Sequence, residues 1–92
     1  MTLTYAWYEL TRNPEVRESL VDEVRETTGG DLPGADAIDT LGRTRNVIRE
    51  TLRLYPPVWG VNRETTEAVT LGGYEIPAGA QVLLPQWVLH RD

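Results

Sequence analysis

Glu50 and Arg53 are the two residues whose types and spacing suggest a specific charged contact. Side chains three positions apart share one face of a helix, so a carboxylate and a guanidinium at this spacing can meet. Most pairs of this kind are solvated surface contacts that contribute little to stability. A pair that lies in a core instead needs partners for its remaining hydrogen-bonding groups, because the desolvation of two charges is costly.

The composition excludes several other kinds of site. The 92 residues contain no cysteine, so they hold no disulfide, zinc–thiolate site, iron–sulfur cluster or thiol nucleophile. His90 is the single histidine, which rules out a multi-histidine metal site. The formal net charge of −5 gives no electrostatic attraction for nucleic acid or for an anionic membrane face. No apolar run approaches the ~20 residues of a membrane span.

Two helices are predicted ahead of the charged pair. Apolar residues recur at helical spacing over Thr2–Arg12, in a pattern that begins without a convincing capping residue. The second helix covers Pro14–Thr27, because Asn13 can cap it and Gly29 follows its end. We predict a loop over Asp31–Ala37, which contains proline and glycine.

The third predicted helix carries the charged pair. Asp39 or Thr40 could cap its N-terminus. The helix stops before Pro56, because proline disfavours the α conformation in the residue that precedes it. Its apolar stripe consists of Leu41, Ile48, Leu52 and Tyr55.

The period of the apolar residues changes after position 58. The predicted strands are a short one near Trp59–Arg63 and two that pair with each other, Ala68–Leu71 and Ala80–Leu84, with Tyr74–Ile76 between them. Pro85 opens a last short helical turn through Leu89. The predicted fold class is therefore mainly α with a small β-sheet (α+β), helical over residues 1–57 and β-rich over residues 58–92.

Both ends of the sequence suggest a larger parent domain. The first helix begins within its own apolar pattern, and the chain stops at His90-Arg91-Asp92 without closing a core. We therefore expect the chain to be an internal segment of a single larger domain.

Four blocks of the sequence resemble the cytochrome P-450 family. Residues Glu50–Pro57 (ETLRLYPP) are similar to the family's E-x-x-R helix with its proline stop. Asn13–Val16 (NPEV) resembles the turn that follows the long central helix, and Leu71–Gly79 (LGGYEIPAG) resembles a hairpin of the family. Leu89–Asp92 (LHRD) resembles the stretch after that hairpin. The blocks stand in the family's order, so the resemblance covers essentially the whole chain and implies a partial cytochrome P-450 fold of three helices followed by a β-hairpin region.

The resemblance implies structural roles for several residues. Glu50 and Arg53 match the pair that packs behind the haem and joins a second arginine further along, which this chain lacks. We interpret them as a structural pair that is short of partners here, without a role in proton transfer. Arg63 matches an arginine that binds a haem propionate in many members. A guanidinium suits that role because it recognises a carboxylate through two parallel hydrogen bonds. Alternatively, Arg63 ends a strand and pairs with Glu64 or Glu67.

The segment after the third helix matches one that lines the family's substrate pocket. It consists of Val58, Trp59, Gly60 and Val61. Apolar side chains at these positions would suit an apolar substrate. Simple core packing of Val58 and Val61 is the alternative, and Trp59 could equally belong to a core. The family does not use the position of His90 as an iron ligand, so we interpret it as a hydrogen-bonded structural residue.

The cofactor implied by the resemblance is haem, with its iron held by a cysteine thiolate. That cysteine lies downstream of Asp92 in the family, and the acid–alcohol pair of the central helix lies before Met1. The resemblance therefore implies no catalytic residue and no metal ligand within the chain. We expect the parent to bind haem and these 92 residues alone to bind none and to be inactive.

The resemblance also implies partners. The parent would be a monooxygenase that hydroxylates a small organic substrate with O2 and electrons from NAD(P)H, delivered by a ferredoxin or a reductase. It would not bind nucleic acid. It would be cytoplasmic if microbial, and an N-terminal membrane anchor would lie outside this segment.

Two alternatives stand beside this interpretation. One is a small free-standing α+β protein-interaction module without catalytic activity, which would bind through the apolar face of its first helix. The other is a small helical DNA-binding domain, which the net charge of −5 disfavours.

Overall fold

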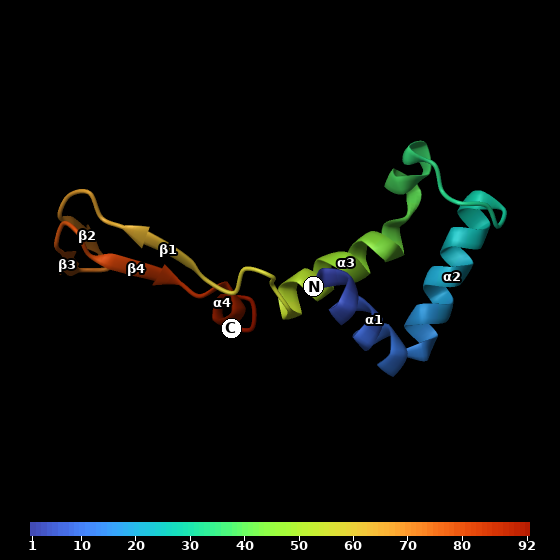
Figure 1. Cartoon of the computed structure of the whole chain (residues 1–92), viewed down its shortest axis with the longest axis horizontal. Helices are drawn as coiled ribbons and strands as arrows, with labels where there is room; N and C mark the ends of the chain where they lie inside the picture. Colours follow the sequence, from blue (N-terminus) through green and yellow to red (C-terminus); the bar gives the residue numbers. More distant parts are fainter. The chain divides into compact units, whose positions relative to one another are not determined.

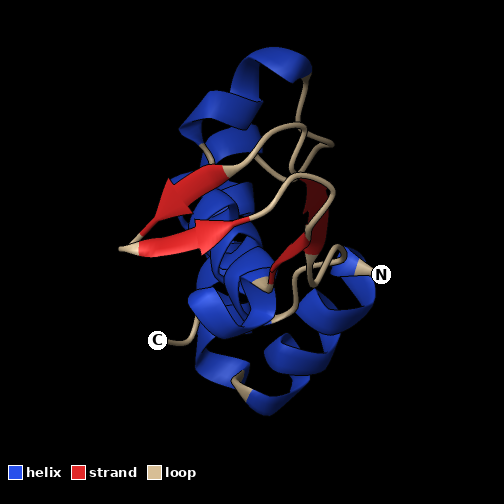
Figure 2. Cartoon of the chain, turned by 90° about the vertical axis from the view of Figure 1, so that its left-hand side faces the viewer, coloured by secondary structure: helices blue, strands red, loops and turns tan.

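The computed structural model describes residues 1–92 and divides into two compact units. We call Met1–Pro57 the helical unit and Val58–Asp92 the strand unit, and each is described by itself. Helices predominate, and the strands form small antiparallel pairs (Figures 1 and 2). The predicted α+β class is confirmed. None of the helices combines the length and the apolarity that a membrane span requires.

The three predicted helices are all present in the helical unit. They are α1 (Thr2–Arg12), α2 (Pro14–Thr28) and α3 (Gly42–Leu54), and each packs against the other two (Figure 1). A short 3₁₀ helix, η1 (Ala35–Thr40), precedes α3 and replaces the end of the predicted loop. Gly29 ends α2 in the left-handed conformation, with φ of 67°, which costs glycine little because it has no Cβ.

The predicted cap of α3, Asp39 or Thr40, is wrong. Asp39 and Thr40 belong to η1, and the residue at the N-cap position of α3 is Leu41, which has no capping side chain. Asn13 does precede α2, but its side-chain amide donates to the carbonyl of Glu9, at 2.9 Å. The same carbonyl also accepts the backbone amide of Asn13 at 3.0 Å, so Asn13 binds the end of α1 twice. The amides of Val16 and Arg17, near the start of α2, donate to the backbone carbonyl of Asn13.

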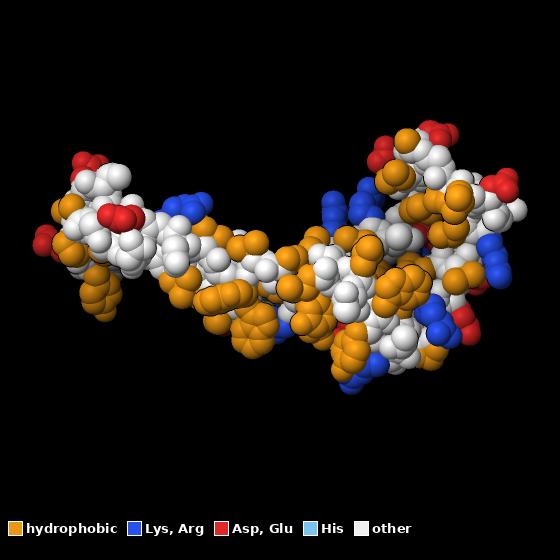
Figure 3. Space-filling view, in the orientation of Figure 1, with side chains coloured by type: hydrophobic (Ala, Val, Ile, Leu, Met, Phe, Trp, Pro, Cys, Tyr) orange, Lys and Arg blue, Asp and Glu red, His pale blue; other side chains and the backbone are white.

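The core of the helical unit is small. Its buried residues are Ala6, Leu10, Leu41 and Thr51. The hydroxyl of Thr51 donates to the carbonyl of Val47 at 2.8 Å, so this polar group is buried with its hydrogen bond made. Large apolar side chains remain on the surface over the helices (Figure 3). Hydrophobic burial alone therefore does little to fix how these helices pack.

The pairing of the strands differs from the prediction. Strand β1 (Val61–Glu64) pairs with β4 (Gln81–Leu84), and β2 (Val69–Leu71) pairs with β3 (Tyr74–Ile76), both antiparallel (Figure 1). The predicted pairing of residues 68–71 with 80–84 is wrong. Gly72 and Gly73 both have positive φ, 58° and 86°, and such a two-residue turn joins the strands on either side of it.

Thr65 closes the outer hairpin just beyond β1. Its amide donates to the carbonyl of Ala80 at 3.0 Å, and its carbonyl accepts the amide of Gly79 at 2.7 Å. Its hydroxyl donates to the carbonyl of Pro77 at 2.6 Å and accepts the amide of Ala80 at 3.0 Å. The β1–β4 ladder is thereby extended to the point where the inner hairpin begins. After β4, a short helix α4 (Gln86–Leu89) follows Pro85, as predicted.

Candidate functional site

Glu50 and Arg53 form a two-pronged ion pair on the last turns of α3. Nε of Arg53 donates to Oε2 of Glu50 at 2.8 Å, and Nη2 donates to Oε1 at 2.5 Å. Both carboxylate oxygens are thus engaged by a single guanidinium, in the geometry that makes arginine–carboxylate pairs specific. The hydrogen bond from Arg53 is the main reason that the pKa of Glu50 lies below its ordinary value, and the same bond raises the pKa of Arg53.

The pair is exposed. The side chain of Glu50 is 56% exposed and that of Arg53 is 43% exposed. Solvent therefore reaches both groups, and desolvation affects each pKa less than the hydrogen bond between them does. The lowered pKa keeps Glu50 ionised and the raised pKa keeps Arg53 protonated, so the pair has little tendency to transfer a proton.

A carboxylate from α2 binds the N-terminus of α3. Glu23 accepts the backbone amide of Arg43 at 2.7 Å through Oε1 and that of Thr44 at 2.9 Å through Oε2. The hydroxyl of Thr44 donates to the same Oε2 at 2.9 Å. Desolvation acts to raise the pKa of Glu23, but the hydrogen bonds from Arg43 and Thr44 outweigh it, so the pKa lies below its ordinary value.

A carboxylate from α1 binds the other end of α3. Tyr55, the residue that follows α3, donates its hydroxyl proton to Oε1 of Glu9 at 2.6 Å. Its ring lies parallel to that of Tyr5, with the ring centroids 4.3 Å apart. The bond to Glu9, desolvation and the charge of Glu9 all raise the pKa of Tyr55, because each disfavours the phenolate.

Two hollows adjoin these helices. A pocket of about 210 Å³ includes Glu50 among the residues that line it, with Glu9, Leu10, Asn13, Val16, Val47, Thr51 and Leu54. An open groove of about 530 Å³ lies between α1, α2 and α3, and apolar side chains such as Trp7, Leu20 and Ile48 dominate its lining. Arg17 and Arg25 are its charged members. Neither hollow contains a cluster of groups that could perform acid–base or nucleophilic chemistry.

The remaining candidates lie in the strand unit. Val58 and Trp59 are exposed, at 57% and 62%, whereas Gly60 and Val61 are partly covered. The carbonyl of Trp59 accepts the amide of Trp87 from α4 at 3.1 Å. A Cβ at Gly60 would lie 3.1 Å from Cδ1 of Leu83, so β4 passes close to this segment. Core packing of Val58 and Trp59 does not occur within these 92 residues.

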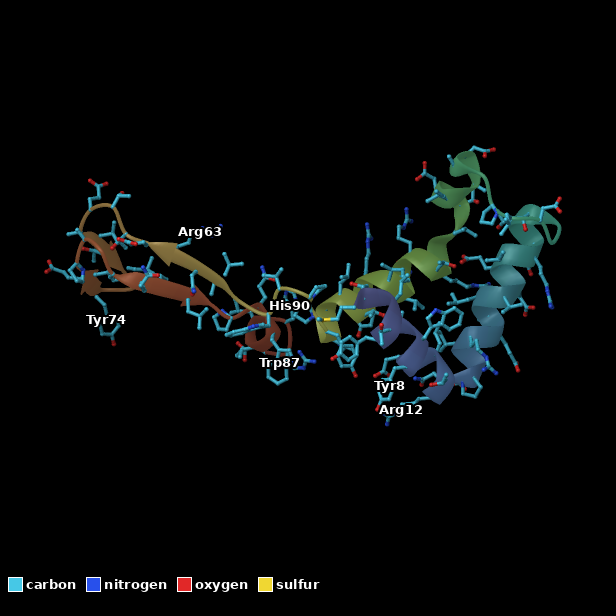
Figure 4. All side chains as sticks on the ribbon, in the orientation of Figure 1. Tyr8, Arg12, Arg63, Tyr74, Trp87 and His90 are labelled. Carbon is cyan, nitrogen blue, oxygen red and sulfur yellow. The ribbon has the colours of Figure 1, made fainter.

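Arg63 projects from β1 (Figure 4). One of its terminal nitrogens donates to the carbonyl of Asn62 at 2.9 Å. The alternative prediction, a pair with Glu64 or Glu67, is not observed, because Glu64 accepts a bond from Gln81 instead and Arg63 makes no ion pair. The guanidinium therefore keeps donors for an external carboxylate.

His90 follows α4, and its amide donates to the carbonyl of Gln86 at 2.9 Å (Figure 4). No group of three or more histidine, cysteine or acidic side chains in the chain could hold a metal ion. Arg91 lies over the ring of Trp87, with its guanidinium carbon 4.1 Å from the ring centroid. These contacts give the last residues a structural role in the turn after β4.

Comparison with known proteins identifies the family. The sequence profile described as Cytochrome P-450 matches residues 1–92, the whole chain. The chain belongs to the cytochrome P-450 family. The interpretation made from the four sequence blocks is thereby confirmed, and no finding favours a separate interaction module or a DNA-binding domain.

Individual cytochromes P-450 match at substantial identity. The chain is 44% identical over 90 residues to cyclooctatin synthase of Streptomyces melanosporofaciens, and this match covers 98% of the chain and 20% of that protein. It is 37% identical over 91 residues to cyclooctat-9-en-7-ol 5-monooxygenase of the same organism, with 99% and 20% covered. Secologanin synthase 2 of Catharanthus roseus is 38% identical over 90 residues, with 98% and 17% covered. The chain thus spans about a fifth of the length of these relatives.

One side chain of this chain has the chemistry to bind a carboxylate of haem. Arg63 carries a guanidinium without an ion pair, which suits a propionate. The 92 residues contain no cysteine and therefore supply no thiolate for the iron.

Sequence reasoning missed Glu23 and the partnership of Glu9 with Tyr55. Both carboxylates lie on predicted helices, but their partners are 20 and 46 residues away along the chain. No local spacing rule connects residues so far apart. The one available signal was the lack of a good capping residue directly before Gly42, which implies that the first amides of α3 need an acceptor from elsewhere.

Proposed function

We propose that these 92 residues are part of a haem-dependent monooxygenase that hydroxylates a small organic substrate with O2. Electrons would derive from NAD(P)H and arrive through a ferredoxin or a reductase. The match of the family profile over the whole chain carries this proposal, and one relative is named a monooxygenase. When bound, haem supplies the oxygen chemistry, and the protein orients the cofactor and the substrate.

The residues of this chain would have supporting roles. Arg63 would bind a haem propionate through its guanidinium, and Glu50 with Arg53 would stabilise the fold on the far side of the haem. The apolar run of Val58, Trp59, Gly60 and Val61 would line the substrate pocket, where its exposed apolar surface favours an apolar substrate. The 92 residues alone would be inactive, because no thiolate is among them. We propose a cytoplasmic location if the source is microbial, with any membrane anchor outside this segment.

The propionate role is tested in the full-length protein encoded by the same gene. We expect the wild type to give the carbon monoxide spectrum of a thiolate-ligated haem. Arg63→Ala should lose haem more readily to an acceptor protein, because one charge-assisted contact to the cofactor is gone. Arg45→Ala is the control, since Arg45 is an exposed arginine of α3. A full-length protein that binds no haem would refute the function, and equal haem loss in both variants would refute the role of Arg63 alone.

A further inference from the structure

The N-terminus of α3 lacks a cap of its own. A helix leaves its first backbone amides without partners inside the helix. Leu41, at the N-cap position, has no side chain that could accept them, and Gly42 begins the helix. Glu23 of α2 takes this role from 20 residues away, since it accepts the amides of Arg43 and Thr44 and the hydroxyl of Thr44.

The electrostatics reinforce this contact. The N-terminus of a helix carries a partial positive charge, which stabilises a nearby carboxylate. Arg43 is the charged side chain that acts on Glu23 from α3, and it lowers the pKa of Glu23. The charged residues of η1 (Asp36 and Asp39) and of α1 (Glu9 and Arg12) make no hydrogen bond or ion pair with Glu23. The contact therefore depends on the ionised form of this one carboxylate.

The contact fixes the N-terminal end of α3, next to the buried Leu41. At the C-terminal end, Tyr55 is already tied to α1 by its bond to Glu9 and its stacking on Tyr5. Glu23 ties the N-terminal end to α2. With both ends fixed to different helices, α3 has one direction and one rotation about its axis. The rotation determines where Glu50 and Arg53 point, because both lie on this helix.

We propose that Glu23 is a positioning residue, which orients α3 and with it the pair formed by Glu50 and Arg53. That this orientation serves a monooxygenase rests on the proposed function. The orientation of α3 by Glu23 is a property of the 92 residues themselves. Glu23 does not touch cofactor or substrate. It acts through the backbone of Arg43 and Thr44, at the opposite end of the helix from the pair.

The test follows the backbone amide signals of Arg43 and Thr44 by NMR in the 92-residue chain, from neutral to acidic pH. We expect both signals to shift together with the protonation of one carboxylate whose pKa lies below the ordinary glutamate value of 4.5. Amides that do not respond, or that respond at the ordinary value, overturn the proposal. This measurement needs only the wild-type chain, so it does not depend on the folding of a variant.

Variants then test whether the effect reaches the pair. Glu23→Gln should abolish the pH response of the two amides and speed their hydrogen exchange about tenfold, the size expected for a lost N-cap. It should also broaden the Nε–H signal of Arg53. Asp22→Asn removes the same charge from an exposed neighbouring position and should change neither. Identical behaviour of the two variants, or an unchanged Arg53 signal, overturns the proposal. Absence of haem from the full-length protein would refute the proposed function and leave these results unaffected.

Discussion

Tyr55 and Glu9 are joined by a 2.6 Å hydrogen bond that links the end of α3 to α1 across 46 positions of sequence. The same tyrosine stacks on Tyr5, one helical turn before Glu9 on α1. The ring of Tyr55 packs against α1, and its hydroxyl makes a directional hydrogen bond to α1. A single residue therefore fixes both the distance between α1 and α3 and the rotation of α3 about its axis. The E-x-x-R pair stands on the turns of α3 just before this contact.

Tyr55→Phe should separate these two contributions. The variant keeps the stacked ring and loses the bond to Glu9, so we expect the urea midpoint of the helical unit to fall by roughly 0.3–1 M. Far-UV circular dichroism measures the change. Tyr74→Phe is the matched control, because Tyr74 is 79% exposed on β3. Equal midpoints for Tyr55→Phe and wild type would show that the hydroxyl bond contributes nothing.

The same hydroxyl predicts how stability depends on alkaline pH. The folded chain raises the pKa of Tyr55, first through the bond to Glu9, then through desolvation and the charge of Glu9. A raised pKa means that the contribution to stability is complete below the unfolded value of 10.0 and is lost as the pH rises through the folded value. Wild type should therefore lose urea resistance above about pH 10 more steeply than Tyr55→Phe does. Parallel curves would contradict this.

Among the core residues, truncation of Leu10 should lower the free energy of unfolding most. It is 8% exposed on α1, and it borders both hollows of the helical unit. We expect Leu10→Ala to lower the free energy of unfolding by about 2–3 kcal/mol, the low end for buried leucine, because the neighbouring groove already lets the site relax. Leu3→Ala, at a position that is 66% exposed on the same helix, should change it by less than about 0.5 kcal/mol. Similar losses in both variants would mean that α1 is not packed as described.

The sequence was sufficient to predict the helices because their signals are local. Pro14 at the first position of α2, Gly29 after its end and Pro56 beyond α3 all act within a few residues. The E-x-x-R contact was predictable for the same reason, since a spacing of three residues fixes it. These features depend on backbone preferences that the rest of the fold does not change.

The features that were not predicted depend on distant partners. Asn13 has two uses for its amide, and only the folded chain shows that it binds the end of α1. The pairing of β4 with β1 required a choice among several short strands of similar composition. Glu23 looks like any other acid of an exposed helix face until α3 is placed beside it. In each case several arrangements satisfy the local rules, and tertiary contacts select one.

Substitutions at Gly72 test whether the turn between β2 and β3 determines how these strands pair. Its φ of 58° is unfavourable for a residue with a branched Cβ. Gly72→Val should destabilise the β2–β3 hairpin by about 1–2 kcal/mol, whereas Gly72→Asn should nearly preserve it, because asparagine tolerates this conformation. The measurement is the cross-strand nuclear Overhauser effect between Thr70 and Glu75, which are register partners. An intact hairpin in the valine variant would show that the turn does not set the register.

Arg53→Lys should expose how much the E-x-x-R pair depends on its two-pronged geometry. Lysine keeps the charge but cannot present two parallel donors. Since the bond from Arg53 is the main cause of the lowered pKa of Glu50, the variant should move that pKa back toward its ordinary value of 4.5. A lowered pKa contributes stability above the unfolded value, which is lost as the pH falls through the folded value. The variant should therefore lose less helicity on acidification than wild type, and an unchanged Glu50 titration by NMR would contradict the assignment.

The same substitution in the full-length protein distinguishes a surface pair from a structural one. In the 92-residue chain both partners are exposed, so Arg53→Lys should leave the helicity at neutral pH nearly unchanged. If the parent covers this pair, the lost donor leaves part of Glu50 without a partner in a place where water cannot compensate. We then expect most of the haem incorporation to be lost, measured as haem per polypeptide after purification. Arg49→Lys, the same change at an exposed position of α3, should retain haem. Equal incorporation by both lysine variants would assign the pair to the solvated surface of the parent as well.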